Sequence, residues 1–144
     1  MQPKILSGEA VSKDMRAEMA EEVERLKAEH NLTPGLAVVL VGDNPASISY
    51  IRGKRAACKN IGIHSVEHNL SASLPEADVI EVVEKLNADP AIHGILVQLP
   101  LPDGFNEQAV LNTILPEKDG DGLHPVNLGK LVRGEEGFLP CTPH

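Results

Sequence analysis

Residues 36–54, Leu-Ala-Val-Val-Leu-Val-Gly-Asp-Asn-Pro-Ala-Ser-Ile-Ser-Tyr-Ile-Arg-Gly-Lys, decide the fold of this chain. The apolar run at the start is typical of a buried strand. A helix should follow, because Asn44 can cap a helix N-terminus and Pro45 fits the first helical position. Gly62 is a natural stop, so the helix is predicted to span residues 45–61. A strand, a turn and a helix in this order indicate a parallel α/β unit.

Apolar strands and amphipathic helices alternate along the rest of the chain. We predict a helix over residues 8–29, a strand over 63–70, a helix from a Ser73–Glu76 capping box to about 87–90, a strand over 94–100, and short helices over 108–115 and 126–132. The first helix should bury an apolar face made of Val11, Met15, Met19, Val23 and Leu26. The pattern predicts an α/β fold, a three-layer domain with a mostly parallel sheet flanked by helices.

Lys54 is unusual in the central helix, because the helical pattern places this charged residue on the inward side. At about 3.6 residues per turn, one inward stripe collects Ser47, Tyr50, Ile51, Lys54, Ala57, Cys58 and Ile61. A lysine with little access to water has a lowered pKa, which suits proton transfer. Tyr50, one turn earlier, could stack a planar ligand against the amine. Such a pair is also common on ordinary helices, where the lysine reaches solvent and the tyrosine packs in the core.

The composition limits the possible functions. The chain has 144 residues, enough for one domain, and its net charge of −8 argues against nucleic acid or an anionic membrane as partner. No apolar run of about 18 residues is present to span a bilayer, and the N-terminus lacks a signal-peptide pattern. Two cysteines do not make a disulfide framework, and six histidines lack metal-ligand spacing. We therefore expect a cytoplasmic protein without a metal.

Gln98 and Asp121 are two further candidates for a ligand site. Gln98 ends an apolar strand, and the carboxyl ends of parallel strands are where open α/β sheets place their ligand clefts. Asp121 lies between Gly120 and Gly122, where the backbone can approach a ligand closely. Its carboxylate could accept two parallel N–H bonds from an aminopyrimidinone edge. The alternatives are a glutamine that bonds to a neighbouring loop and an ordinary Asp-Gly turn.

Four motifs occur together and in order: Val-Gly-Asp-Asn-Pro-Ala-Ser-x-x-Tyr-x-x-x-Lys (41–54), Gly-Ile-Leu-Val-Gln-Leu-Pro-Leu-Pro (94–102), Lys-Asp-x-Asp-Gly-x-His-Pro-Val-Asn-x-Gly-Lys-Leu (118–131) and Pro-Cys-Thr-Pro (140–143). With them the chain resembles the methylenetetrahydrofolate dehydrogenase/methenyltetrahydrofolate cyclohydrolase family. The resemblance covers its N-terminal, tetrahydrofolate-binding catalytic domain, expected over residues 1–136. Residues 137–144 would begin the linker to an NADP-binding Rossmann domain, whose G-x-G-x-x-G fingerprint does not occur here.

The resemblance implies a role for each matching position. Lys54 would be the catalytic lysine, Tyr50 would stack on the folate ring, and Gln98 would orient the Lys54 amine. Asp121 would anchor the pterin amino edge. Substrate contacts are also implied for Ser47, Leu99 and Pro140. Gly120 departs from the family pattern, where valine is expected, and could loosen the loop that aims Asp121. A polyglutamate tail of the substrate could meet the basic side chains of the central helix, Arg52, Arg55 and Lys59.

The implied activity belongs to one-carbon metabolism and purine biosynthesis. The parent enzyme, a homodimer, would oxidise 5,10-methylenetetrahydrofolate with NADP and hydrolyse the methenyl product to 10-formyltetrahydrofolate. This chain alone should lack the dehydrogenase step. Two alternatives stay open: a non-catalytic folate-binding or dimerisation module, and a site like that of short-chain dehydrogenases. The missing dinucleotide fingerprint and the early position of Tyr50 and Lys54 argue against the second.

Overall fold

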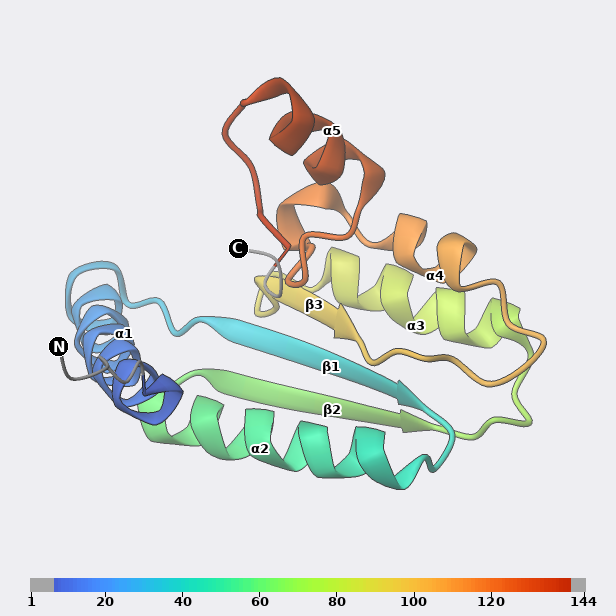
Figure 1. The fold of residues 1–144 in the computed structure, drawn as a ribbon, viewed down its shortest axis with the longest axis horizontal. Helices are drawn as coiled ribbons and strands as arrows, with labels where there is room; N and C mark the ends of the chain where they lie inside the picture. Colours follow the sequence, from blue (N-terminus) through green and yellow to red (C-terminus); the bar gives the residue numbers. More distant parts are fainter. Residues whose placement is uncertain (1–6, 141–144) are drawn as a thin grey trace, which may run out of the picture.

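The computed structural model describes residues 7–140, in which three parallel strands form one sheet flanked by helices (Figure 1). The elements are α1 (Gly8–His30), β1 (Gly35–Val41), α2 (Pro45–Ile61), β2 (His64–Leu70), α3 (Glu76–Ala88), β3 (Gly94–Val97), α4 (Glu107–Thr113), the 3₁₀ turn η1 (Pro116–Lys118) and α5 (Pro125–Arg133). The strand order is β2-β1-β3, which puts the strand of the opening stretch in the centre. The predicted α/β class and parallel sheet are confirmed.

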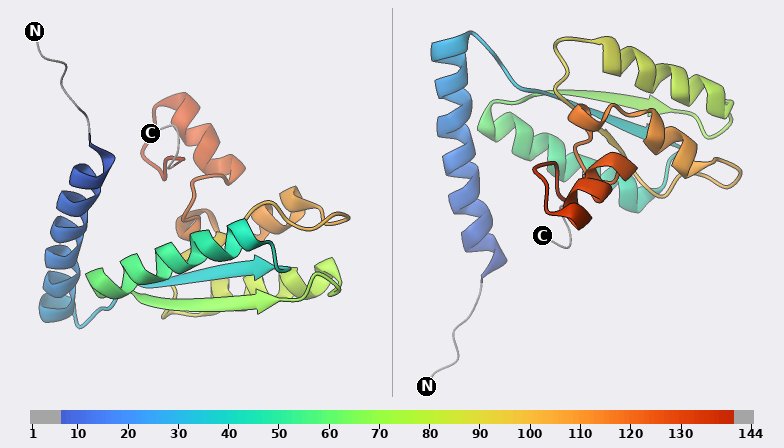
Figure 2. Two further views of the ribbon diagram at one scale, coloured as in Figure 1. Left: turned by 60° about the horizontal axis from the view of Figure 1, so that its bottom comes forward. Right: turned by 90° about the horizontal axis from the view of Figure 1, so that it is seen from above.

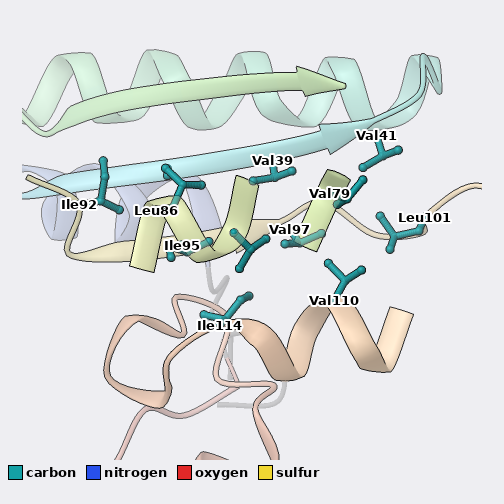
Figure 3. Close-up of a cluster of buried hydrophobic side chains, with 12 residues drawn as sticks. Val39, Val41, Val79, Leu86, Ile92, Ile95, Val97, Leu101, Val110 and Ile114 are labelled. Carbon is teal, nitrogen blue, oxygen red and sulfur yellow. The ribbon is translucent and has the colours of Figure 1, made fainter. Parts of the chain in front are cut away.

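The two faces of the sheet carry separate apolar clusters, because successive side chains of a strand point to opposite faces. Figure 3 shows the larger cluster, which joins β1 and β3 to α3 and α4 and includes Val39, Val79, Val83, Ile95 and Val110. The smaller cluster lies under α2 and contains Val38, Leu40, Ile51 and Leu96. α2 therefore covers one face and α3 the other (Figure 2), while α4 packs with α3 into the larger cluster.

Both ends of α2 form as the sequence predicts. Asn44 Oδ1 accepts hydrogen bonds from the backbone N–H groups of Ala46 (2.9 Å) and Ser47 (3.4 Å), and Pro45 occupies the first helical position. Gly62 ends the helix with φ at 84°, a conformation that favours glycine. These caps fix where α2 begins and ends over the sheet.

Two predictions about neighbouring elements are wrong. The Ser73–Glu76 capping box does not form: α3 begins at Glu76 after Pro75, without a side-chain cap, and Ser73 Oγ bonds to Ser71 Oγ instead. The third strand ends at Val97 rather than at Pro100. The N–H of Gln98 still donates to the Val39 carbonyl, but Pro100 has no N–H to continue the ladder.

α1 packs against α2 and crosses one end of the sheet, beyond which part of the helix extends (Figure 2). Val23 is buried as predicted, but Val11, Met15 and Met19 are 56%, 49% and 44% exposed. The prediction of one continuous buried face is therefore wrong for the N-terminal half of α1. The three exposed side chains line a groove of about 680 Å³, together with others that include Ala57 and Ile61 of α2.

Candidate functional site

Lys54 and Tyr50 lie one turn apart on the solvent-facing border of α2. Lys54 Nζ is 4.5 Å from the centre of the Tyr50 ring, a cation–π distance. Lys54 is half-buried, whereas Tyr50 is 61% exposed. The inward prediction is therefore wrong for Tyr50. Ser47, Ile51 and Cys58 face the sheet, and at about 100° per residue Tyr50 falls on the flank of that stripe. Its ring is accessible beside the amine.

Asp121 lies within electrostatic reach of Lys54 although the two residues are far apart in sequence. Burial is the main influence on the Asp121 carboxyl, and it raises the pKa above its ordinary value. The Lys54 charge acts in the opposite direction, and the nearby Asp119 charge adds to the increase. The structure therefore brings together an amine, an accessible aromatic ring and a half-buried carboxyl group, contributed by α2 and the loop before α5.

The loop that carries Asp121 is folded around the buried side chain of Asp119, which is 3% exposed. Asp119 Oδ1 accepts the N–H of Leu123 (3.2 Å), and Oδ2 accepts the N–H of His124 (2.8 Å). On the other side, the N–H of Gly120 donates to the Ile95 carbonyl of β3 at 3.1 Å. Asp121 is thus held between a residue tied to the sheet and a turn closed by a carboxylate. The sequence predicts that Gly120 could loosen the loop. The hydrogen bond from its N–H to the Ile95 carbonyl restrains the backbone at this position.

Gln98 lies on the α2 side of the sheet by strand alternation, because Leu96 belongs to the α2 cluster and Val97 to the opposite one. Its Nε2 donates to the Leu99 carbonyl at 2.8 Å. Its Oε1 is buried and has no hydrogen-bond partner within residues 7–140. A buried acceptor without a partner is costly, so the position favours a donor from a flexible side chain or a ligand.

The remaining candidate residues have mixed placements. Ser47 is buried against the sheet at the start of α2, and Leu99 packs at the rim of the larger apolar cluster. Pro140 is buried, and a Cβ built on Gly122 would lie 2.7 Å from its nitrogen. The tail therefore runs directly beside the Asp121 loop, as the predicted lining role requires. Cys141 and residues 142–144 lie outside the described part of the chain.

Two structural residues of the third motif were missed as such. Lys118 Nζ donates to the carbonyls of Leu86, Asn87 and Asp89, so it caps the C-terminal end of α3. Asn127, 1% exposed, bonds to the Asp119 carboxylate. The sequence signal for these roles is the Lys118-Asp119 pair, which follows an apolar helix and a turn, together with Asn127 in the next helix. Pattern alone could not distinguish it from surface charge.

Asp121→Asn is expected to make the folded chain more stable than the wild type at pH 7. A raised carboxyl pKa means that the fold disfavours the ionised form, and a neutral amide removes that cost. The cost is fully present above the folded-state pKa and disappears as the pH falls below the ordinary value of 3.8. Urea unfolding at several pH values tests this, with the exposed Asp103→Asn as control. A variant that is less stable at pH 7 and loses that deficit in acid would contradict it.

The sequence profile named "Tetrahydrofolate dehydrogenase/cyclohydrolase, catalytic domain" matches residues 6–121. This chain belongs to the tetrahydrofolate dehydrogenase/cyclohydrolase family. It is 56% identical over 143 residues to the bifunctional protein FolD of Bradyrhizobium diazoefficiens, an alignment that covers 99% of the chain and 49% of the relative. With FolD of Geobacillus thermodenitrificans it shares 52% identity over 144 residues, 100% of the chain and 50% of the relative. The resemblance found in the four motifs is thereby confirmed.

Solved structures of the family have the same fold. The methylenetetrahydrofolate dehydrogenase-cyclohydrolase (FolD) of Trypanosoma brucei, solved with NADP cofactor and an inhibitor, superposes with a TM-score of 0.93 at 36% identity. The match covers 98% of this chain and 49% of that one. FolD of Campylobacter jejuni gives 0.91 at 44% identity, over 93% and 48%. The chain therefore spans about half the length of the relatives that it matches.

Residues 7–140 contain neither a membrane-spanning helix nor a metal-binding cluster. No helix in this part of the chain is long and apolar enough to cross a membrane. Among the same residues, no three His, Cys, Asp or Glu side chains are grouped so that they could hold a metal ion.

Proposed function

We propose that this chain is the tetrahydrofolate-binding, catalytic half of a bifunctional enzyme. The enzyme oxidises 5,10-methylenetetrahydrofolate with NADP and hydrolyses the 5,10-methenyl product to 10-formyltetrahydrofolate. The observation that supports this most directly is the meeting of Lys54, Tyr50 and Asp121 on one surface. Family membership supports the substrate class. The catalytic domain would comprise residues 1–136, with residues 137–144 as the start of a linker to a second domain.

Two groups would hold the folate, and a third would orient the catalytic amine. The Asp121 carboxylate accepts two N–H bonds from the aminopyrimidinone edge of the pterin, a pairing that is stronger than neutral hydrogen bonds. Tyr50 stacks against the ring system, which its exposure allows. The unpartnered Oε1 of Gln98 accepts an N–H hydrogen bond from the Lys54 amino group and so orients it. Ser47, Pro140 and the backbone of Leu99 would complete the walls around the substrate, since the Leu99 side chain packs against the larger apolar cluster.

Lys54 would serve the hydrolytic step by moving protons. Water adds to the methenyl carbon, a C–O bond forms, and the positive charge of the N5–CH–N10 unit is neutralised. Lys54 acts here as a neutral amine and takes the proton that the water loses. The C–N5 bond then breaks, N5 gains a proton as the carbinol oxygen loses one, and the formyl group stays on N10. One proton is released overall, and a positioned acid–base group typically contributes about 10²–10⁴-fold to such a step.

The N-terminus of α2 does not fit the pyrophosphate of NADP. Open α/β sheets bind the pyrophosphate of a dinucleotide at a helix N-terminus, and at α2 that position is used by Asn44 Oδ1, which accepts the N–H groups of Ala46 and Ser47. We therefore assign no step of this chain to the cofactor. In a protein of the relatives' length, NADP would be held mainly by the other half.

Several further properties are part of the proposal. These are a cytoplasmic location, homodimer formation, a place in one-carbon metabolism that feeds purine synthesis, and use of polyglutamylated folates. For the last, α2 sets a constraint: Arg52, Arg55 and Lys59 lie on the flank opposite Tyr50, and Arg55 Nε is already 3.6 Å from Glu67. A polyglutamate tail would have to pass around the N-terminal end of α2 to reach them.

The absorbance of 5,10-methenyltetrahydrofolate tests the proposal, because ring opening removes it. We expect the 144-residue chain to accelerate the decay slightly, since part of the substrate surface is open, and a two-domain protein carrying it to do so strongly. No acceleration by either protein would contradict the catalytic assignment.

The exposure of Tyr50 favours a second candidate, folate binding or dimerisation without turnover. Saturable binding of 5-formyltetrahydrofolate by a chain that leaves the absorbance decay unchanged would support folate binding without turnover. Dimerisation without folate binding would be seen as a doubled mass by light scattering.

A further inference from the structure

Asn127 is the most deeply buried polar side chain in the described part of the chain, at 1% exposure. It lies on α5, which stands away from the sheet (Figure 1). Its Nδ2 donates to the Pro116 carbonyl and to Asp119 Oδ2, both at 2.9 Å, so both hydrogens of the amide are used. A buried amide with two acceptors on different segments ties those segments together. Here it joins α5 to η1 and to the base of the loop that carries Asp121.

Asp119 transmits this restraint to the rest of the loop. Oδ2, the oxygen bonded by Asn127, also accepts the N–H of His124, while Oδ1 accepts the N–H of Leu123. The carboxylate therefore has three N–H donors, which enclose residues 119–124 in one closed turn. If Asn127 is removed, the buried charge of Asp119 loses a donor, and water or a shifted loop must replace it.

We propose that Asn127 is a positioning residue for folate binding, which acts through Asp119 to hold the Asp121 carboxyl towards Lys54. The inference rests on the proposed function for its ligand and on the hydrogen bonds above for its geometry. Asn127 itself faces Pro116 and Asp119. Its effect on folate binding therefore passes through the loop and requires the Asp121 side chain.

Asparagine is the side chain that this position requires. Alanine removes both donors, and aspartate would place a second carboxylate against Asp119 Oδ2, where like charges repel. Serine keeps one donor of shorter reach, which cannot bridge two acceptors. These differences make the position suitable for a graded series of variants.

A double-mutant cycle tests the dependence on Asp121. Binding of 5-formyltetrahydrofolate is measured by calorimetry for the wild type, Asn127→Ala, Asp121→Ala and the double variant. We expect Asn127→Ala to weaken binding about ten-fold or more, as displaced binding groups do. In the double variant it should add nothing to the loss caused by Asp121→Ala. Additive losses would overturn the proposal, because they would show an effect that does not pass through Asp121.

A second readout does not need folate. The ¹³C signal of the Asp121 carboxyl, assigned by its loss in Asp121→Asn, is titrated with acid in the wild type and in Asn127→Ala. Release of the loop should expose the carboxyl to water and lower its midpoint towards the ordinary value. The charges that act on it are Lys54 and Asp119, and neither is changed by the substitution. An unchanged midpoint together with unchanged binding would overturn the proposal.

The control is Asn106→Ala, which removes the side-chain cap of α4 on the other face of the sheet. It should lower stability while leaving folate binding and the Asp121 midpoint unchanged. If Asn127→Ala does not fold, Asn127→Ser takes its place in both measurements. If the wild type does not bind 5-formyltetrahydrofolate but the midpoint moves, the proposed function fails and the positioning role stands. If binding depends on Asp121 but not on Asn127, the positioning role fails alone.

Discussion

Lys54→Ala is expected to lower the rate of methenyltetrahydrofolate hydrolysis by about 10²–10⁴-fold in a two-domain protein that carries this chain. In the isolated chain, it should reduce the slight acceleration to the rate seen without protein. The variant removes the proton-transferring amine but little of the core, because Lys54 is half-buried at the border of α2. The loss of its cation–π contact with Tyr50 should cost about 0.5–1 kcal/mol of folding stability. The measurements are the absorbance decay of the substrate and a urea unfolding curve.

Lys59→Ala is the matched control, since Lys59 is an exposed lysine of the same helix. It should leave the hydrolysis rate and the unfolding free energy close to those of the wild type. A folded Lys54→Ala protein that hydrolyses the substrate at the wild-type rate would remove Lys54 from the mechanism.

Gly122→Ala should impair both folding and folate binding. Gly122 has φ at +67°, and a Cβ there would lie 2.5 Å from the Leu139 carbonyl carbon and 2.6 Å from its oxygen. Both the left-handed backbone and the clash with main-chain atoms oppose a side chain, so we expect a loss of about 1–3 kcal/mol. Gly122 is next to Asp121, and its added Cβ would displace the segment that ends at Pro140. Folate binding should therefore weaken more than in a variant that loses the same stability at a site far from the loop.

Gly129→Ala provides the contrast for this prediction. Gly129 lies inside α5 with nothing within 4 Å of its added Cβ, so alanine there should stabilise the chain by about 0.5–1 kcal/mol. Urea unfolding and calorimetric titration with 5-formyltetrahydrofolate compare the two variants. Equal stability and binding for Gly122→Ala and the wild type would contradict the close packing of the tail on the loop.

Local signals in the sequence were sufficient for the central unit of the fold. Asn44, Pro45 and Gly62 act through bonds and dihedral angles within a few residues, so their pattern fixed both ends of α2. The parallel sheet was predicted from apolar strands that alternate with amphipathic helices along the chain, a pattern that is also visible in the sequence. The strand at 94–100 was predicted too long, because the end of β3 depends on which neighbour can continue the ladder.

Features that depend on distant packing were less predictable. The exposure of Met15 and Met19 follows from how far α1 extends past the sheet, which its own periodicity does not report. Likewise, the exposure of Tyr50 depends on which elements pack against the flank of α2, and the sequence of α2 alone does not show this. The burial of Asp119 and Asn127 arises from pairing across a loop and a helix. Motif matching included both residues without showing that they support Asp121.

The most direct test of the folate site uses the fact that Tyr50 is the single tyrosine of the chain. Its ring protons give NMR signals that no other tyrosine can overlap, and a stacked pterin must shift them. Titration with 5-formyltetrahydrofolate should produce a saturable shift of these signals in the wild type and none at the same concentrations in Asp121→Ala. If the ring signals of Tyr50 stay unchanged while the ligand binds, the pterin lies elsewhere and the site formed by Tyr50, Lys54 and Asp121 is wrong.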